Sequence, residues 1–426
     1  MTEARAAVDC FPCNSLEREL FYPCPVMKAL LTTLCALLVA LLPAAEPARP
    51  YYSARPGALE KSKSLIAQGD ETAKKAFKKL VADADKALAV VPPSVTEKTK
   101  VPPSGDKHDY MSLAPYFWPD PSKPDGQPYL RKDGKVNPES RDEAANDTLR
   151  MRLIGSSLET LCLAYYFTKD EKYATQAAKL MKVWFLAPET RMNPNLRFAQ
   201  AVAGKNDGRG TGILESRTIG EIADAAGLLA GSAAWTAADQ KQLDQWLGQF
   251  LDWLLTSGPG KDEAAAKNNH GTWFDVQATQ IALAIGRKDV AKRILEAVPK
   301  KRIAVQVESD GRQPMELSRT ASFSYCCFNL EAHALLANFG DHVGVDLWKA
   351  GSKEPRSFRH ALDYLTPYLD VPPKKWPGEQ IKDAHPEDML PVLRLAALAY
   401  REPAYEALVA KYPGAASKRF QLLSPR

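Results

Sequence analysis

Most of the chain carries apolar residues at steps of three and four, the spacing that places them on one face of an α-helix. The pattern first runs through residues 59–90, and it resumes after residue 148 to continue almost to the C-terminus. Strand-like alternation is scarce, and residues 302–307 form the one plausible strand. The later predicted helices span residues 149–167, 171–185, 213–234, 237–255, 264–284, 287–298, 323–337, 358–368, 389–400 and 403–411.

Short connections join these helices, as residues 168–170 do between the first two of the later set. A succession of antiparallel helix pairs predicts either a solenoid or a closed α/α toroid. The sequence has no repeat of fixed period, which counts against a repeat solenoid. The pattern therefore predicts one predominantly α-helical domain over residues 55–415.

Two long irregular segments interrupt the helical pattern. Residues 94–139 are rich in proline, aspartate, glycine and aromatic residues, most densely at 109–121. Residues 192–212 carry Gly208 and Gly210, but no strand precedes them and no Lys-Ser/Thr pair follows, so a phosphate-binding loop is not indicated. Loops this long in a compact domain tend to be functional. With 32 prolines and 8 tryptophans in the chain, we expect long ordered loops and an aromatic-lined cleft.

The overall composition restricts the class of partner only mildly. The chain has 426 residues, of which 45% are hydrophobic and 25% charged, as in ordinary soluble globular proteins. Its formal net charge of +5 fits a polyanionic ligand, although an uneven surface charge explains it equally well. No lysine-rich block or RNA-binding signature is present, so we expect no nucleic-acid partner.

The N-terminal region has the layout of an export signal. Met27 and Lys28 precede a nearly continuous apolar run over residues 29–42, and small residues follow it at 43–45. We expect residues 27–45 to be a signal peptide and residues 1–26 to be a gene-model extension. The apolar run is too short for a comfortable transmembrane helix. The expected product is a periplasmic or secreted protein without stable membrane insertion after removal of the leader.

Two short segments bring together groups suited to one reaction. Residues 268–273 contain Asn269 and His270, and residues 316–325 contain Arg319 and Tyr325. Arginine pairs with a carboxylate through a forked set of donors, asparagine adds a neutral donor, and histidine donates or accepts. Tyrosine has a reference pKa of about 10 and needs nearby positive charge to act as a base. Together these groups predict β-elimination of a uronate.

Helix geometry restricts how Arg319 and Tyr325 can meet. Six residues of a regular helix turn about 600°, which leaves the two side chains roughly 120° apart. We therefore expect Arg319 near a helix start and Tyr325 inside the first turns. Other interpretations stay open for the single residues: a capped turn at His270, an intrahelical Glu316–Arg319 ion pair, and core packing for Tyr325 and Trp273.

The two segments, with residues 109–121, 133–139 and 193–200, resemble the alginate lyase superfamily over roughly residues 55–410. The resemblance extends to the helical-toroid polysaccharide lyases of family 38 and, more distantly, family 5. It implies an all-α fold, an α/α toroid or incomplete α/α barrel of antiparallel helix pairs with long aromatic-rich loops. It also implies an enzyme that cleaves an acidic polysaccharide such as alginate or glucuronan by metal-independent β-elimination, with no cofactor.

The resemblance also assigns roles to residues. Asn269 and Arg319 are expected to neutralise the sugar carboxylate. Tyr325 is expected to act as base and acid when the proton and the leaving group lie on the same side of the sugar, and His270 as base when they lie on opposite sides. The expected substrate-binding residues are Tyr116, Trp118, Gln200, Arg209 and Trp273.

Three other classes of protein are weaker candidates. A glycan hydrolase on the same toroid needs a pair of acidic residues, and Asp275, Glu215 and Glu316 form no convincing pair. A non-catalytic protein that binds acidic glycans would need no tyrosine base. A metalloenzyme is disfavoured because the histidines show no tight ligand spacing. The histidines are His108, His270, His333, His342, His360 and His385.

Overall fold

The computed structural model describes residues 49–350, 356–371 and 373–426. The chain divides into two compact units, Met1–Glu46 and Pro47–Arg426. The predicted gene-model extension at 1–26 and the predicted signal peptide at 27–45 both lie outside the described residues. The description below therefore concerns the second unit.

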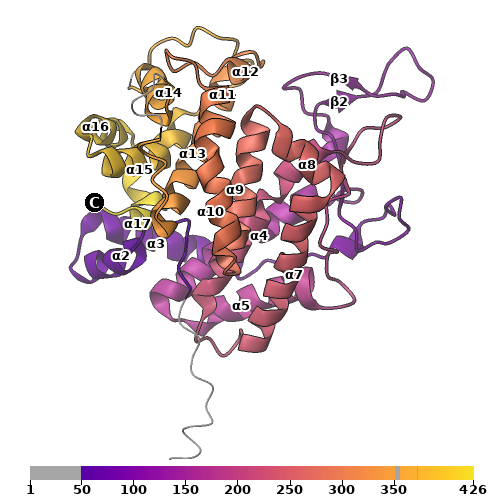
Figure 1. The fold of residues 1–426 in the computed structure, drawn as a ribbon. Helices are drawn as coiled ribbons and strands as arrows, with labels where there is room; N and C mark the ends of the chain where they lie inside the picture. The colour runs from indigo at the N-terminus through magenta and orange to yellow at the C-terminus, as the bar shows by residue number, and fades with distance from the viewer. Residues whose placement is uncertain (1–48, 351–355, 372) are drawn as a thin grey trace, which may run out of the picture. The chain divides into compact units, whose positions relative to one another are not determined.

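Five helices form an inner series in which each packs against the next, and further helices cover them from outside. The inner helices are α4 (Thr148–Thr168), α6 (Arg217–Ala226), α9 (Asn269–Ala284), α13 (Ser322–Val343) and α15 (Leu390–Tyr400). The outer helices are α3 (Glu71–Ala87) and α5 (Glu171–Met181) on α4, α7 (Ala237–Thr256) and α10 (Lys288–Val298) on α9, and α16 (Pro403–Lys411) on α15. This arrangement confirms the predicted all-α toroid (Figure 1).

Burial explains which helices lie inside. Every residue of α9 except His270 is buried, polar residues such as Asp275, Gln277 and Gln280 included, so this helix is covered by protein on all sides. Outer helix α3 buries a single stripe at Ala73, Ala76, Leu80, Ala84 and Ala87 and exposes its lysines. Inner and outer helices thus differ in the width of the face that they bury.

The ends of the second unit pack together. Helix α17 (Phe420–Leu423) contacts α2 (Ala58–Ala67), α3 and α15. The hydrophobic core includes Tyr51 and Leu422, which lie outside the predicted limits of 55–415. The remaining helices are α8 (Gly258–Ala265), α11 (Ala304–Gln306), α12 (Pro314–Leu317) and α14 (Phe358–Leu365), with short 3₁₀ or π turns at Val95–Glu97, Pro138–Arg141, Lys182–Leu186, Gly210–Ser216, Gly227–Leu229, Pro299–Ile303, Thr366–Tyr368, Pro386–Met389 and Ala415–Ser417. No helix in the described part of the second unit is long and apolar enough to span a membrane.

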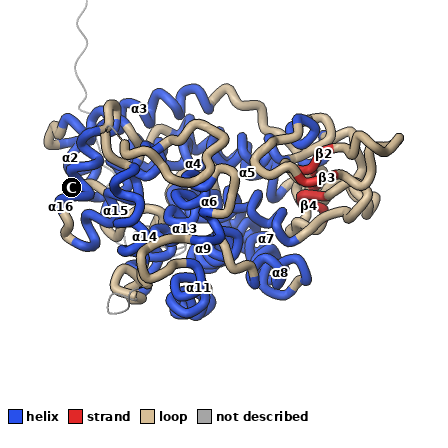
Figure 2. The backbone as a smooth tube through the Cα atoms, turned by 90° about the horizontal axis from the view of Figure 1, so that it is seen from above, coloured by secondary structure: helices blue, strands red, loops and turns tan. Residues whose placement is uncertain are grey.

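The described strands come from the two irregular segments. Strand β1 (Met111–Leu113) pairs in parallel with β4 (Phe198–Ala201), and β2 (Phe117–Trp118) pairs antiparallel with β3 (Leu130–Arg131). Strands β2, β3 and β4 lie together at one end of the helical body, among its longest loops (Figure 2). The predicted cleft loops are thus joined to each other by short backbone ladders.

The predicted strand at 302–307 is wrong, because this segment continues the helical path of α10. Arg302, Ile303, Gln306 and Val307 are buried, whereas Val305 is exposed. Residues 302 and 306 and residues 303 and 307 are buried four positions apart, which is the spacing of a helix and not the alternation of a strand.

Two long predicted helices are each broken once. The segment 59–90 breaks between α2 and α3 at Gly69, whose φ of +86° lies in the left-handed region. The segment 264–284 breaks between α8 and α9, where Asn268 caps α9 by accepting from the His270 N–H. The second break places residues 268–270 at a helix start.

A buried ion pair fixes this helix start. Arg302, which is 1% exposed, donates Nε to Asp275 Oδ2 at 2.7 Å and Nη2 to Asp275 Oδ1 at 3.0 Å. Its Nη1 and Nη2 also donate to the carbonyls of Ala266 and Ala264, which lie at the break. A Cβ atom on Gly271 would lie 2.3 Å from Arg302 Nη1, so only glycine fits beneath this guanidinium.

Arg302→Met is expected to lower the free energy of unfolding by about 3–5 kcal/mol, because it leaves the Asp275 carboxylate buried without its partner. Urea unfolding followed by circular dichroism measures the change. Arg293→Met is the matched control, since the Arg293–Asp289 pair lies on the exposed face of α10 and should contribute little. An unfolding midpoint that is the same for Arg302→Met and Arg293→Met would contradict the role given to the buried pair.

Candidate active site

A cavity of about 660 Å³ lies between the aromatic-rich loop at residues 109–121, the turn at Gly210–Ser216, the α8–α9 break and the start of α13. Its wall is strongly basic. The lining residues include six arginines, and Glu215 is the single Asp or Glu among them. The arginines are Arg131, Arg141, Arg152, Arg209, Arg217 and Arg319. A concave surface of one charge sign concentrates ligands of the opposite charge, so this cavity suits an anionic ligand.

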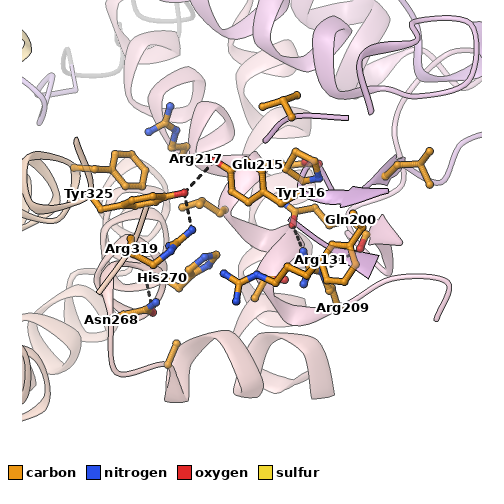
Figure 3. Close-up of a pocket in the computed structure, with 18 of the residues that line it drawn as sticks. Tyr116, Arg131, Gln200, Arg209, Glu215, Arg217, Asn268, His270, Arg319 and Tyr325 are labelled. Carbon is orange, nitrogen blue, oxygen red and sulfur yellow. Dashed lines mark hydrogen bonds between the residues drawn. The ribbon is translucent and has the colours of Figure 1, made fainter. Parts of the chain in front are cut away.

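Arg319 and Tyr325 meet at one end of this cavity (Figure 3). Arg319 precedes α13 and Tyr325 lies in its first turn, as helix geometry predicted. Arg319 Nη2 donates to the Tyr325 hydroxyl at 2.7 Å, and the guanidinium carbon lies 3.7 Å from the centre of the tyrosine ring. The Tyr116 hydroxyl lies 3.0 Å from the Tyr325 hydroxyl. Tyr325 thus has one charged and one neutral hydrogen-bond partner.

Asp133 holds Arg319 from the loop that follows β3. Its Oδ1 accepts from Arg319 Nη2 at 2.8 Å, and its Oδ2 accepts from Arg319 Nε at 3.1 Å and from Thr320 Oγ1 at 3.1 Å. Gly134 has a φ of +71°, and a Cβ atom there would lie 2.6 Å from Thr320 Oγ1. The β2–β3 hairpin is therefore attached directly to the arginine beside Tyr325.

The ionisation of this cluster follows from burial and charge. Burial raises the pKa of Tyr325 above its usual value, the hydrogen bond with Tyr116 adds to the rise, and Arg319 opposes it. Burial would lower the pKa of Arg319, but Asp133 and Tyr325 raise it. Burial would raise the pKa of Asp133, but the hydrogen bonds and charge of Arg319 keep it well below its usual range. At neutral pH the cluster therefore contains an Asp–Arg ion pair and a protonated tyrosine.

His270 lines the cavity from the start of α9. Its Nδ1 lies 2.7 Å from Glu263 Oε1, and Glu263 is buried at the end of α8. The other ring nitrogen has no hydrogen-bond partner among the described residues. When one imidazole nitrogen donates to a carboxylate, the other is left as an acceptor. His270 is thus arranged to accept a proton from a ligand.

Asn269 lies beneath the cavity wall. It is fully buried, and it donates its backbone N–H and its side-chain Nδ2 to the two carboxylate oxygens of Glu316, each at 2.7 Å. Burial raises the pKa of Glu316, and the Asn269 donors oppose that rise. Asn269 is absent from the lining residues, where Asn268 takes the place expected for it. The structure shows Asn269 joining residues 268–273 to residues 316–325.

Of the five predicted substrate-binding residues, Tyr116, Gln200 and Arg209 line the cavity and Trp118 and Trp273 do not. Trp273 is 2% exposed and stacks on Phe328, with 4.8 Å between the ring centres. Trp118 donates Nε1 to the Lys135 carbonyl at 2.9 Å. Neither tryptophan lines the cavity, because each side chain is directed towards other contacts.

Neighbouring rings supply the aromatic surface that the two tryptophans do not. Successive residues of a strand point to opposite sides, so Phe117 lines the cavity and Trp118 does not. Phe328 lines the cavity above Trp273.

Gln200 and Arg209 are hydrogen-bonded to each other, and in Figure 3 they lie on the opposite side of the labelled group from Tyr325. Arg209 Nη2 donates to Gln200 Oε1 at 2.8 Å, and its Nε donates to the Gln200 carbonyl at 3.2 Å. Burial and the nearby Arg131 lower the pKa of Arg209. The negative charge of a bound ligand would counteract both effects on the pKa, because it stabilises the charged form of the guanidinium.

The sequence did not indicate that several other residues would lie at this cavity. Arg131, Arg141, Arg152 and Arg217 are single arginines in four separate segments, and only the fold brings them together. Glu263 precedes His270 by seven residues, but the helix break that turns it towards the imidazole was not predicted.

The acidic residues considered for hydrolysis are dispersed. Asp275 is paired with Arg302 and Glu316 with Asn269, which leaves Glu215 as the single lining carboxylate. The cavity therefore lacks the carboxylate pair of a glycoside hydrolase. Within the described ranges, no group of three or more His, Cys, Asp or Glu side chains is placed to hold a metal ion.

Comparisons with known proteins agree with this geometry. The family model described as alginate lyase matches residues 94–376. A solved alginate lyase from Bacteroides ovatus is 40% identical, with a TM-score of 0.83 over 88% of this chain and 98% of that one. Alginate lyase A1-III from Sphingomonas species A1 is 15% identical, with a TM-score of 0.57 over 89% of this chain and 98% of that one, which shows a shared fold. A search of curated proteins found no match.

The family match covers more than half of the chain, and the Bacteroides relative is similar over nearly all of its own length. The basic cavity with its Tyr–Arg pair and paired histidine lies inside the matched region. The chain therefore belongs to the alginate lyase family, and it is a polysaccharide lyase.

Proposed function

We propose that the protein cleaves alginate or a closely similar polyuronate by β-elimination without a metal ion, and that Tyr325 and His270 are its proton-transfer groups. The observation that carries this proposal is the 2.7 Å contact of Arg319 with the Tyr325 hydroxyl inside a cavity lined by six arginines. The Bacteroides and Sphingomonas relatives are named as alginate lyases, which supports alginate as the first substrate to test.

The reaction needs one base and one acid. The base removes the proton from C5 of the uronate, and the electron pair of that bond forms a C4–C5 double bond. The bond from C4 to the glycosidic oxygen breaks, and the leaving oxygen takes up a proton. Arginines around the carboxylate stabilise the charge that develops on it when C5 loses its proton.

Tyr325 is suited to both proton transfers when proton and leaving group lie on the same side. Arg319 donates to its hydroxyl oxygen, so the phenolate that accepts the C5 proton is stabilised as it forms. After accepting that proton, the same hydroxyl is the acid nearest the leaving oxygen. The Tyr116 hydroxyl, 3.0 Å away, can donate to the phenolate and keep the oxygen oriented.

His270 is suited to remove the proton when it lies on the opposite side from the leaving group. The Nδ1 contact with Glu263 leaves the other ring nitrogen to accept a proton, and the carboxylate stabilises the imidazolium that results. Two bases on separate elements, α9 and α13, therefore serve the two stereochemical courses of elimination. In both courses Tyr325 supplies the proton to the leaving oxygen.

The expected activity is a rise in ultraviolet absorbance from the unsaturated product when purified protein is mixed with alginate, glucuronan or pectate in the presence of a chelator. Tyr325→Phe should lower kcat on the best substrate by about 10²–10⁴-fold, the usual contribution of a proton-transfer group. Tyr166→Phe is the matched control, because that hydroxyl contacts Glu60 outside the cavity. Absence of unsaturated product from all three polymers would rule out the proposed reaction, and full activity in Tyr325→Phe would remove that residue from it.

The pH dependence of kcat separates the two bases. On a substrate cleaved through Tyr325, kcat should rise continuously from about pH 6 to about pH 9, because burial holds the pKa of Tyr325 above the reference value of about 10. A base that is already unprotonated at neutral pH gives a profile that does not rise further above neutrality. Measurements on mannuronate-rich and guluronate-rich fractions of alginate test this assignment. Level profiles above neutrality on both fractions would argue against a tyrosine base.

We also propose that the enzyme is exported, acting in the periplasm or outside the cell. The support is the sequence of residues 27–45, with a lysine, an apolar run and small residues in the order of a signal peptide. Expression of the chain from Met27 in a bacterial host should yield a mature protein whose mass corresponds to cleavage near residue 45. A product that keeps residues 27–45 and stays in the cytoplasm would contradict export.

A further inference from the structure

Two positive side chains converge on one aromatic ring at the end of the cavity where Arg209 lies. Arg209 places its guanidinium carbon 5.0 Å from the centre of the Phe117 ring, and Lys205 places Nζ 5.6 Å from the same point. Phe117 and Arg209 line the cavity, whereas Lys205 is exposed and is not among the lining residues. In Figure 3, Arg209 lies on the opposite side of the labelled group from Tyr325. The basic wall therefore continues beyond the cavity lining at the end away from Tyr325.

The turn that carries Lys205 is packed against the β2–β3 hairpin. The Ala203 carbonyl accepts from the Tyr129 N–H at 3.0 Å, immediately before β3. Gly204 has a φ of +75°, and a Cβ atom there would lie 2.9 Å from Pro128 Cα, so only glycine lets the turn come this close. The backbone thus places the Lys205 side chain next to the hairpin whose first strand, β2, carries the aromatic ring.

The protein leaves the charges of Arg209 and Lys205 without an acidic partner. Arg209 donates to the Gln200 side-chain oxygen at 2.8 Å and to the Gln200 carbonyl at 3.2 Å, and both acceptors are neutral. Neither Arg209 nor Lys205 forms a salt bridge with any described residue. An aromatic ring attracts cations through the negative charge of its faces, but unlike a carboxylate it does not neutralise them. The Phe117 ring therefore holds two cations near each other and leaves their charge for a ligand.

The ligand that fits this arrangement is a carboxylate. Two like charges held close together repel each other, and an anion that contacts both replaces the repulsion by attraction. A guanidinium pairs with a carboxylate through a forked set of donors, and an ammonium donates from a flexible stem. A polyuronate carries one carboxylate on every sugar, so a chain that extends from Tyr325 past Arg209 brings one of them to the two cations.

We propose that Arg209, Lys205 and Phe117 form a subsite for the carboxylate of a uronate beyond the sugar that is cleaved, with Lys205 extending the binding surface outside the cavity. This proposal rests on the function proposed above, and it adds a dependence on chain length. A chain long enough to extend from Tyr325 to Lys205 binds more tightly than a shorter one, because only the longer chain places a carboxylate between the two cations.

Lys205→Gln tests the subsite by removing one charge from a side chain outside the cavity. KM for alginate should rise about two- to fivefold, the usual contribution of one exposed ion pair, while kcat stays unchanged because the substitution is remote from Tyr325. On oligomannuronates of increasing length, the ratio of variant to wild-type KM should equal one for the shortest oligomers that are cleaved and should rise for longer ones. Lys205→Arg keeps the charge and should keep the wild-type KM at every length.

Lys63→Gln is the matched control, because Lys63 also lies over an aromatic ring, with Nζ 3.7 Å from the centre of the Tyr166 ring, and does not line the cavity. It removes the same charge from the protein and should leave KM unchanged at every length. An unchanged KM in Lys205→Gln, an equal rise in Lys63→Gln, or a rise that is the same for short and long oligomers would overturn the proposal.

Calorimetric titration with the same oligomannuronates distinguishes failure of the subsite from failure of the proposed reaction. If the wild type forms no unsaturated product, dissociation constants replace KM, and binding that Lys205→Gln weakens only for the longer oligomers supports the subsite and removes the reaction alone. Cleavage without any length-dependent effect of Lys205→Gln removes the subsite alone. A wild type that binds no oligomer of any length would overturn both proposals.

Discussion

The buried contact between Glu316 and Asn269 is the constraint on which the geometry of the cavity depends. One carboxylate from α12 accepts both the backbone and the side-chain donor of the first residue of α9. His270 follows Asn269 directly, and Arg319 follows Glu316 by three residues, so this contact makes the imidazole and the guanidinium face one cavity. An unpaired buried carboxylate is costly, and this cost keeps the two segments together.

Charge in the cavity is distributed between paired and unpaired arginines. Arg319 is already paired with Asp133, so the tyrosine and the carboxylate share its donors before a substrate enters. Arg141 and Arg152 line the same wall, and neither has an acidic hydrogen-bond partner among the described residues. A polyuronate brings one negative charge per sugar, and a wall with a single carboxylate attracts such a chain along its length. Arg319 therefore acts on the pKa of Tyr325, whereas the other arginines of the cavity supply most of the electrostatic attraction for an anionic chain.

Helical periodicity predicted the fold well because inner and outer helices bury faces of different width, as α9 and α3 do. It failed where tertiary contacts decide the outcome. The break before α9 depends on Arg302, which is far enough along the chain that no local pattern reveals it. The same limit applies to the site. Neighbouring residues on a helix point about 100° apart, so a motif containing Asn269, His270 and Trp273 could not indicate which of them faces the cavity.

Tyr325 and His270, the two proton-transfer groups proposed above, are held by separate sets of contacts. Tyr325 is bound to the β2–β3 hairpin through Arg319 and Asp133, whereas His270 is bound to α8 through Glu263. Neither set of contacts uses a residue of the other, although Glu316 holds both segments in register. Under the proposed mechanism, substrate stereochemistry would therefore select one of these groups as base without disturbing the other. In the mechanism proposed above, a single cavity with Tyr325 as the common acid would thereby serve both orientations of the C5 proton.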